Sequence, residues 1–399
     1  MSKNIPTVVI TKMSPRWRPF QIFILGLYEM ERLGEIKLKF RCDWFYRIST
    51  ILPDLPHLGG IMHQLAAYFL NDSYTMEGYV EKEGKRRTFC IDSDDSPHCY
   101  DGQLLDNVDI YFKTQCPKEI DIEKGFRLTD DVYLPYCDHR HVNPKLSLTA
   151  RGERIPLPNL KQNIHKIRPS VVGFRRLADG NSYSALRNGF DSYRKGILQK
   201  ANKKLMCYFG NAQGPIPMHD LHGPDYESDG FIMGAFPQLH HPNEKRATIA
   251  DIIGQLGEQY DARVISQQAT NDKQAVKRTD LIIPIEDFCA HISNFQYNCN
   301  VSGLRMSMPN RFMESFIVGT AIVTDKLAVK WYLPFEEEVV ELEEMGYLPK
   351  DSVNWNRVTQ QIKALPEISK ETVNKHFEEK WAPVPVARYL VKTVLDAAK

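Results

Sequence analysis

The sequence lacks an excess of charge of either sign. Its 51 lysines and arginines stand against 50 aspartates and glutamates. No overall field would therefore gather nucleic acid or hold the protein on an anionic membrane. Runs of about 20 apolar residues, which a membrane-spanning helix needs, are also missing. The most apolar segment, Phe20 to Leu27, is short, although Arg16 and Arg18 beside it leave open a peripheral contact with a membrane surface.

Closely spaced cysteines are missing as well. The eight cysteines show neither a C-x-x-C pair nor a zinc-finger spacing: Cys42, Cys90, Cys99, Cys116, Cys137, Cys207, Cys289 and Cys299. We interpret them as reduced thiols of a cytoplasmic protein and expect no structural zinc. The first residues lack the apolar segment and the cleavage site of a signal peptide. Since no H-E-x-x-H spacing is present, we also expect no metal in catalysis, although Asp92-Ser-Asp94 leaves a metal-dependent alternative open.

The length and composition predict two domains. A chain of 399 residues with 42% hydrophobic residues can form two cores. Segments typical of strands alternate with helical segments, which predicts an α/β fold with largely parallel sheets. We expect an N-terminal Rossmann-like domain over residues 1–195 and a C-terminal one over residues 200–368. A last helix, within residues 370–399, would pack back on the first domain.

One segment, residues 302–325, combines several signals of an anion site. Ser307 as a cap and Pro309 in the first turn predict a helix from about Pro309 to Val318. The amino end of this helix, with Arg305 and Arg311 near it, suits a diphosphate. Glu314, one turn further, can accept hydrogen bonds from the two hydroxyls of a ribose.

Residues 310–323 read Asn-Arg-Phe-Met-Glu-Ser-Phe-Ile-Val-Gly-Thr-Ala-Ile-Val. They resemble the carboxy-domain signature of GT-B glycosyltransferases, a helix with a ribose-binding glutamate followed by a small-residue turn and a strand. The preceding residues 297–305 resemble the loop before that helix. This resemblance implies two Rossmann-like domains that face one another across a cleft. The candidate donor-binding residues are Arg305, Arg311, Glu314, Ser307, Asn310, Gly210 and Gly303.

The resemblance implies that the protein moves a sugar from a nucleotide-sugar donor to a hydroxyl of a glycan or glycolipid acceptor, without a cofactor or metal. By analogy, the pathway would be the synthesis of bacterial surface polysaccharides. Many retaining members have a second glutamate eight positions before the first, where this sequence has Met306. Inverting and retaining outcomes therefore both stay open.

Other classes of protein remain as alternatives. A dehydrogenase is disfavoured, because no G-x-G-x-x-G follows the first expected strand. A nucleotide-sugar epimerase of the same two-domain form and a non-catalytic interaction protein stay open.

Candidate catalytic residues follow an apolar strand of the first half. Asp92, Asp94 and Asp95, with His98 nearby, lie where parallel sheets place their ligands, and an inverting transfer needs a base for the acceptor hydroxyl. The same residues also fit a capped turn ahead of Pro97, so both interpretations stand.

Two other loops have ligand-binding composition. Lys12, Arg16 and Arg18 lie in the first strand-to-helix loop and are candidates for binding an anionic acceptor, although a charged surface turn is an equally simple interpretation. Gly210 opens the segment GNAQGPIP, which we expect to be a loop where the backbone approaches a donor phosphate closely.

Overall fold

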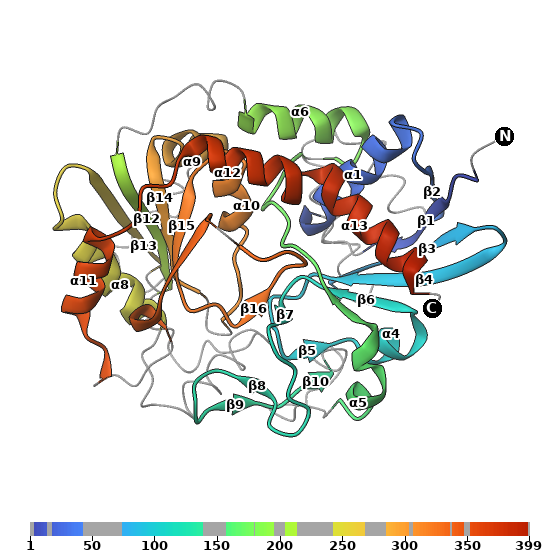
Figure 1. Ribbon diagram of the computed structural model, residues 1–399, viewed down its shortest axis with the longest axis horizontal. Helices are drawn as coiled ribbons and strands as arrows, with labels where there is room; N and C mark the ends of the chain where they lie inside the picture. Colours follow the sequence, from blue (N-terminus) through green and yellow to red (C-terminus); the bar gives the residue numbers. More distant parts are fainter. Residues whose placement is uncertain are drawn as a thin grey trace.

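A computed structural model describes residues 4–13, 18–42, 74–138, 157–178, 180–194, 204–213, 242–267, 285–302, 306–335, 337–346 and 352–397. The protein has a mixed α/β fold with two main sheets, one drawn mostly in blue and cyan and the other mostly in green and orange in Figure 1. Several helices lie along the same side of both sheets in this view.

The first sheet has six strands in the order β11-β6-β4-β3-β1-β2. They are β1 (Thr7–Met13), β2 (Lys37–Phe40), β3 (Thr75–Lys82), β4 (Lys85–Asp92), β6 (Ile110–Lys113) and β11 (Ile167–Pro169). The expectation of a largely parallel sheet is confirmed except at β3, which alone runs antiparallel, to both β1 and β4. The cause is the two-residue turn of Glu83 and Gly84, whose φ angles of 54° and 74° are typical of a tight hairpin.

The second sheet is entirely parallel, with five strands in the order β13-β12-β14-β15-β17. They are β12 (Lys204–Gln213), β13 (Tyr260–Gln267), β14 (Phe295–Asn300), β15 (Ala321–Asp325) and β17 (Val339–Leu342). After β12 the chain forms β13 on one side of it, and it then forms β14, β15 and β17 on the other side. In open sheets of this kind, ligands bind outside the carboxyl ends of the two strands where the direction reverses, here β12 and β14.

Helices cover both sheets. The longer ones are α1 (Gln21–Arg32), α6 (Tyr183–Arg194), α8 (Pro242–Gly254), α9 (Ile285–Ile292), α11 (Trp355–Lys363), α12 (Lys370–His376) and α13 (Pro383–Asp396). The short ones are α4 (Gly102–Asn107), α5 (Leu160–Asn163), α10 (Arg311–Phe316) and the 3-10 turns η1 (Arg18–Phe20), η3 (Ile164–Lys166) and η6 (Glu343–Met345). A π-helical turn, η8 (Phe377–Trp381), joins α12 to α13.

Small strand pairs lie beside the sheets. They are β5 (Cys99–Tyr100) with β10 (Cys137–Asp138), β7 (Cys116–Pro117) with β16 (Val329–Lys330), and β8 (Phe126–Arg127) with β9 (Tyr133–Leu134). The β7–β16 pair joins a segment of the first half of the chain to one of the second.

One hydrophobic core runs through both halves of the chain. It includes Phe112 of the first sheet, Phe316 behind the second sheet and Trp381 of η8. The rings of Phe316 and Trp381 stack with their centroids 5.0 Å apart. A second cluster surrounds β5 and β10 and includes Tyr100, Tyr111, Phe126, Tyr136 and Met306.

The last helix packs against the first sheet's α1, as Figure 1 shows. Gly26 of α1 lies directly under the backbone of Pro383 at the start of α13. Arg388 of α13 also donates to Glu35 at 2.9 Å, and the Tyr389 hydroxyl donates to the Pro169 carbonyl at 2.8 Å. Residues 383–389 therefore hold α13 on the first half of the chain.

Replacing Gly26 with alanine should lower the free energy of unfolding by about 1–3 kcal/mol, because the new Cβ would overlap the Pro383 carbonyl and force α13 away. Chemical denaturation measures this change. Gly254→Ala is the matched control, since no atom lies within 4 Å of a Cβ at that helix end. Equal stability of both variants would contradict the close packing of α1 on α13.

Candidate functional site

The loop from β14 to α10 lies at the point where the strand order of the second sheet reverses. Within it, residues 301–302 and 306–310 are described, whereas the candidates Gly303 and Arg305 lie outside the described residues. Met306 has a φ of 53° and is buried. A left-handed conformation is costly for a residue with a side chain, and such residues cluster at ligand sites.

Helix α10 is shorter than expected, and its start differs. It begins at Arg311 and ends at Phe316, and its N-cap is Asn310, with no side-chain capping bond. The prediction that Ser307 caps the helix is therefore wrong, and Pro309 precedes the helix. A helix of six residues sums few peptide dipoles, so the attraction of its amino end for an anion is weaker than the sequence led us to expect.

Side chains and carbonyls of the first half of the chain hold this loop in place. The amide of Gln115 donates to the Met308 carbonyl and accepts from the Met308 N–H, both at 2.8 Å. The Asn310 side chain donates to the Gly173 carbonyl at 2.7 Å. Paired amide contacts of this kind fix both position and orientation, so the loop is fixed relative to the first sheet.

Glu314 is completely buried and faces residue 175 of the connection between the sheets. Its carboxylate accepts from the Arg175 N–H at 3.4 Å and from the Arg175 guanidinium at 3.3 Å. The Arg175 side chain is 54% exposed. Since the guanidinium covers the carboxylate, a ribose would reach Glu314 only after the Arg175 side chain moves aside.

Positive charge gathers around Arg311. Burial lowers the pKa of Arg311; the charges of Arg246 and Arg175 lower it further, while Tyr208 and Glu314 oppose them. Arg246 comes from α8, Arg311 from α10 and Arg175 from the connecting segment. Three guanidinium groups therefore act on one another, and two of them, those of Arg246 and Arg311, are partly buried. This concentration of positive charge favours the binding of an anion.

Lys245, a neighbour of Arg246 in sequence, has a different environment. Its ammonium group lies 3.5 Å from the Asp325 carboxylate and donates to the carbonyls of Met345 and Gly346 at 3.0 and 3.3 Å. Asp325 also accepts from the Ser302 N–H at 3.0 Å. Because its donors are used inside the protein, Lys245 orders the start of the β14–α10 loop.

Two buried polar side chains at this site lack hydrogen bonds. Among the described residues, neither amide atom of Asn300 has a partner, although Asn300 is only 1% exposed. The Tyr208 hydroxyl is also buried and without a hydrogen-bond partner there. Tyr208 pairs in register with Cys299, so the side chains of Tyr208 and of the next residue, Asn300, leave opposite faces of two neighbouring strands. Unpaired buried polar atoms are rare in native proteins, and a bound ligand is one way to satisfy them.

The structure also shows where two other predicted donor-binding residues, Gly210 and Ser307, lie. Gly210 lies inside β12, which continues to Gln213, so our expectation of a loop at Gly210 is wrong. The strand is longer because Gly210 to Gln213 pair in register with β13. Ser307 is partly buried in the loop just before Pro309.

The acidic segment after β4 has an internal role. Asp92 is completely buried and accepts from the Tyr111 hydroxyl at 2.6 Å and the Lys113 ammonium at 2.8 Å. Its other oxygen accepts from the Asp94 N–H at 2.8 Å. Asp94 in turn accepts from the Ser96 N–H at 2.7 Å, which is the capped turn that the sequence left open.

The other candidates of this region differ in exposure. Asp95 is exposed, whereas His98 is buried. Lys12 lies inside β1, so the expectation of a loop there is wrong; it is exposed and pairs with Glu77 of the neighbouring strand β3 at 2.9 Å. Arg18 is exposed in η1. Arg16 lies outside the described residues. The structure brings Arg311, Asn310 and Glu314 together, with Asp92 and Asp94 in a separate network.

Sequence reasoning missed Asn300, Tyr208, Arg175 and Gln115. Asn300 and Tyr208 look like ordinary strand residues, and only their burial without partners marks them. Arg175 is 139 positions from Glu314, and Gln115 is 193 positions from Met308. No local pattern in the sequence signals contacts over such separations.

Comparison with models of protein families, with curated proteins and with solved structures finds no match to this chain. In the part of the chain that the structure describes, none of the helices combines the length and the apolar character needed to cross a membrane.

Replacing Lys113 with methionine should lower the free energy of unfolding by about 3–5 kcal/mol, because it leaves the Asp92 carboxylate buried without its ion pair. Thermal and chemical denaturation measure the loss. Lys12→Met is the control, since the exposed pair with Glu77 should contribute little. Similar losses in both variants would contradict the structural role of the buried pair.

The stability that the ion pair of Lys113 and Asp92 contributes should not change with a moderate rise in pH. Burial lowers the pKa of Lys113, but the charges of Asp92 and Asp94 outweigh it and raise the pKa above the ordinary lysine value. A raised pKa contributes stability that is complete below the ordinary pKa and is lost as the pH passes the raised value. The difference between wild type and Lys113→Met should therefore stay constant at neutral pH and narrow only in strongly alkaline solution, as denaturation at several pH values would measure.

Proposed function

We propose that the protein is a glycosyltransferase that takes its donor, a nucleotide-sugar, at the carboxyl ends of β12 and β14. The observation that supports this most directly is a pair of buried polar side chains, Asn300 and Tyr208, without hydrogen-bond partners among the described residues, with Tyr208 in the field of Arg311 and Arg246. A nucleoside diphosphate offers the complementary chemistry, since it has a charged diphosphate and many hydrogen-bonding groups. The site lies where doubly wound parallel sheets bind nucleotides.

The charges suit the leaving group of a sugar transfer. In that reaction the bond between the sugar and the diphosphate breaks, so negative charge grows on the departing diphosphate. Arg311, Arg246 and Arg175 would stabilise this charge. This role needs no bound divalent ion, in agreement with the metal-independent transfer that the sequence led us to expect.

Glu314 would hold the ribose once the donor is bound. The diphosphate would attract Arg175, which is mostly exposed, away from the Glu314 carboxylate. The freed carboxylate could then accept from the two ribose hydroxyls. Arg175 would in this way leave the Glu314 carboxylate and bind the diphosphate. Donor binding would thus change the contacts of the segment between the two sheets.

The acceptor would approach from the first sheet, in the GT-B arrangement of two Rossmann-like halves. Lys12 and Arg18 would attract an anionic glycan or glycolipid. Asp94 or Asp95 would serve as the base, because the Asp92 carboxylate is occupied by Tyr111 and Lys113.

Two measurements test the proposed function. Thermal shift with UDP-, GDP- and CMP-linked sugars should show stabilisation by one nucleotide family. Release of the nucleoside diphosphate in the presence of a glycan acceptor should then show transfer. Conversion of the sugar nucleotide into its epimer, without release, would replace the proposal with an epimerase. Indifference to the whole panel would favour a non-catalytic interaction protein.

Asn300→Leu should abolish most of the donor-induced thermal shift and weaken donor binding by about 10- to 100-fold, because the ligand loses two amide hydrogen bonds. The free protein should be as stable as wild type or more so, since an apolar group of similar shape replaces an unpaired buried amide. Isothermal titration measures the donor affinity of the wild type and of the variant. Asn107→Leu is the control, because Asn107 is an exposed residue of α4. Unchanged donor affinity in Asn300→Leu would exclude this residue from the site.

A further inference from the structure

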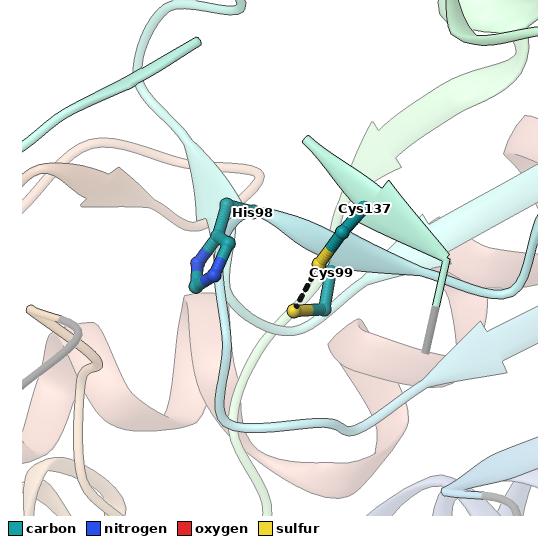
Figure 2. A group of neighbouring side chains, drawn as sticks. All are labelled: His98, Cys99 and Cys137. Carbon is teal, nitrogen blue, oxygen red and sulfur yellow. Dashed lines mark hydrogen bonds between the residues drawn. The ribbon is translucent and has the colours of Figure 1, made fainter. Parts of the chain in front are cut away.

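A second group of side chains, apart from the proposed donor site, converges beside the first sheet. His98 and Cys99 lie at the start of β5, and Cys137 lies at the start of β10 (Figure 2). Cys99 and Cys137 face each other directly in the parallel register of these strands, and their sulfur atoms are 3.0 Å apart. One nitrogen of His98 and the two sulfurs all lie within 4.8 Å of one another.

The protein holds these three groups firmly. His98 and Cys137 are buried, and Cys99 is partly exposed. The Cys137 N–H donates to the His98 carbonyl at 3.0 Å, which fixes the backbone of one ligand against that of another. The His98 ring stacks on Phe126 with the two planes 21° apart. The arrangement is therefore set before any ligand binds, which lowers the entropy cost of binding.

The chemistry of this donor set is selective. Two thiolates and an imidazole are the ligands that zinc prefers, and they discriminate against magnesium and calcium, which take oxygen ligands. Zinc–sulfur bonds of about 2.3 Å in a tetrahedron place two sulfurs roughly 3.8 Å apart. The thiols of Cys99 and Cys137 would therefore separate by less than about 1 Å, which side-chain rotation allows.

We propose that His98, Cys99 and Cys137 bind one zinc ion, with a water molecule as the fourth ligand on the partly exposed side of Cys99. Binding replaces the two thiol protons with the ion and releases both protons to solvent. Two thiolates then balance the two positive charges of zinc, so the buried site carries no net charge.

A disulfide between Cys99 and Cys137 is the competing use of these atoms. It would need an oxidant to accept two electrons. The convergence of a third ligand on the two sulfurs favours the metal. Because the ion must displace two thiol protons, its affinity should fall as the pH decreases.

The ion would have a structural effect. The β5–β10 pair has only two residues in each strand, and it joins positions 38 apart in the sequence. A strand pair of this length has few hydrogen bonds of its own. Closing the intervening loop, which contains β6 to β9, through a metal would stabilise the fold by restricting the unfolded chain.

Metal content and cobalt substitution test the proposal. Protein purified with a thiol reductant and without chelators should contain one zinc per chain by mass spectrometry of the elements. Replacement of zinc by cobalt should produce the charge-transfer absorption of cobalt bound to thiolate. Removal of the ion should lower the melting temperature, and zinc alone should restore it.

Variants locate the site. Cys137→Ser should lose the thiolate absorption and most of the bound zinc, and His98→Gln should weaken zinc binding at least 10-fold. Cys116→Ser should keep both signals, since Cys116 is a buried thiol of the cluster around β5 and β10 that approaches the Pro117 carbonyl and is not one of the three converging groups. If Cys137→Ser does not fold, the wild-type cobalt spectrum and His98→Gln decide the outcome.

Three results would overturn the proposal. They are the absence of zinc in protein whose thiols are free and reduced, a Cys99–Cys137 disulfide found by mass spectrometry under reducing purification, and zinc binding that is unchanged in both site variants. None of these results affects the proposed donor site, which uses other residues.

Discussion

The segment from Lys113 to Lys118 joins the two sheets, and the candidate donor site depends on it. Lys113 holds the Asp92 carboxylate inside the first half. Gln115 holds the backbone of Met308, and the next two residues form β7, which pairs with β16. Lys118 continues the contact, since its N–H donates to the Ala328 carbonyl at 2.8 Å. Six consecutive residues thus connect the interior of the first half to the loop before α10.

This connection explains why the loop can keep a left-handed residue. Met306 has an unfavourable backbone conformation, which persists only where surrounding contacts determine it. Gln115 and the buried cluster around Tyr111 and Tyr136 supply such contacts from the first half of the chain. The strained residue and the side chain that restrains its loop therefore come from distant parts of the sequence, and together they fix the loop that leads into α10.

Local patterns predicted the elements better than their arrangement. The sequence favours strands over residues 296–301 and 320–324, and β14 and β15 each lie within one residue of those bounds. For β15 the apolar and β-branched residues account for this agreement. The hairpin of β3 and β4 was missed, since Glu83 and Gly84 are a weak turn signal. Helix α10 was expected to be longer because Pro309 fits a first turn, yet the Asn310 contact with Gly173 delays the helix.

Only some residues of the candidate sites could be predicted from the sequence. Arg311, Asn310 and Glu314 lie in one short segment, so local spacing singled them out. The proposed zinc ligands were missed because a parallel strand pair brings Cys99 and Cys137 together across 38 positions, far beyond the short spacings of the motifs that we searched for. The side-chain amide of Asn300 is buried without a hydrogen-bond partner among the described residues. Such a feature arises only when the protein is packed, so the sequence alone gives no sign of it.

The π-helical turn η8 sets how the last two helices relate to each other. A turn of this kind contains one residue more than an α-helical turn, and each residue of a helix advances the side chains by about 100°. The extra residue orients Trp381 toward Phe316 while α13 keeps its face against Gly26. The helix ends there, because Ala382 has an extended backbone with φ −63° and ψ 161°, and α13 begins anew at Pro383. The direction of α13 is thus set by this one extended residue and by the close contact of Pro383 with Gly26.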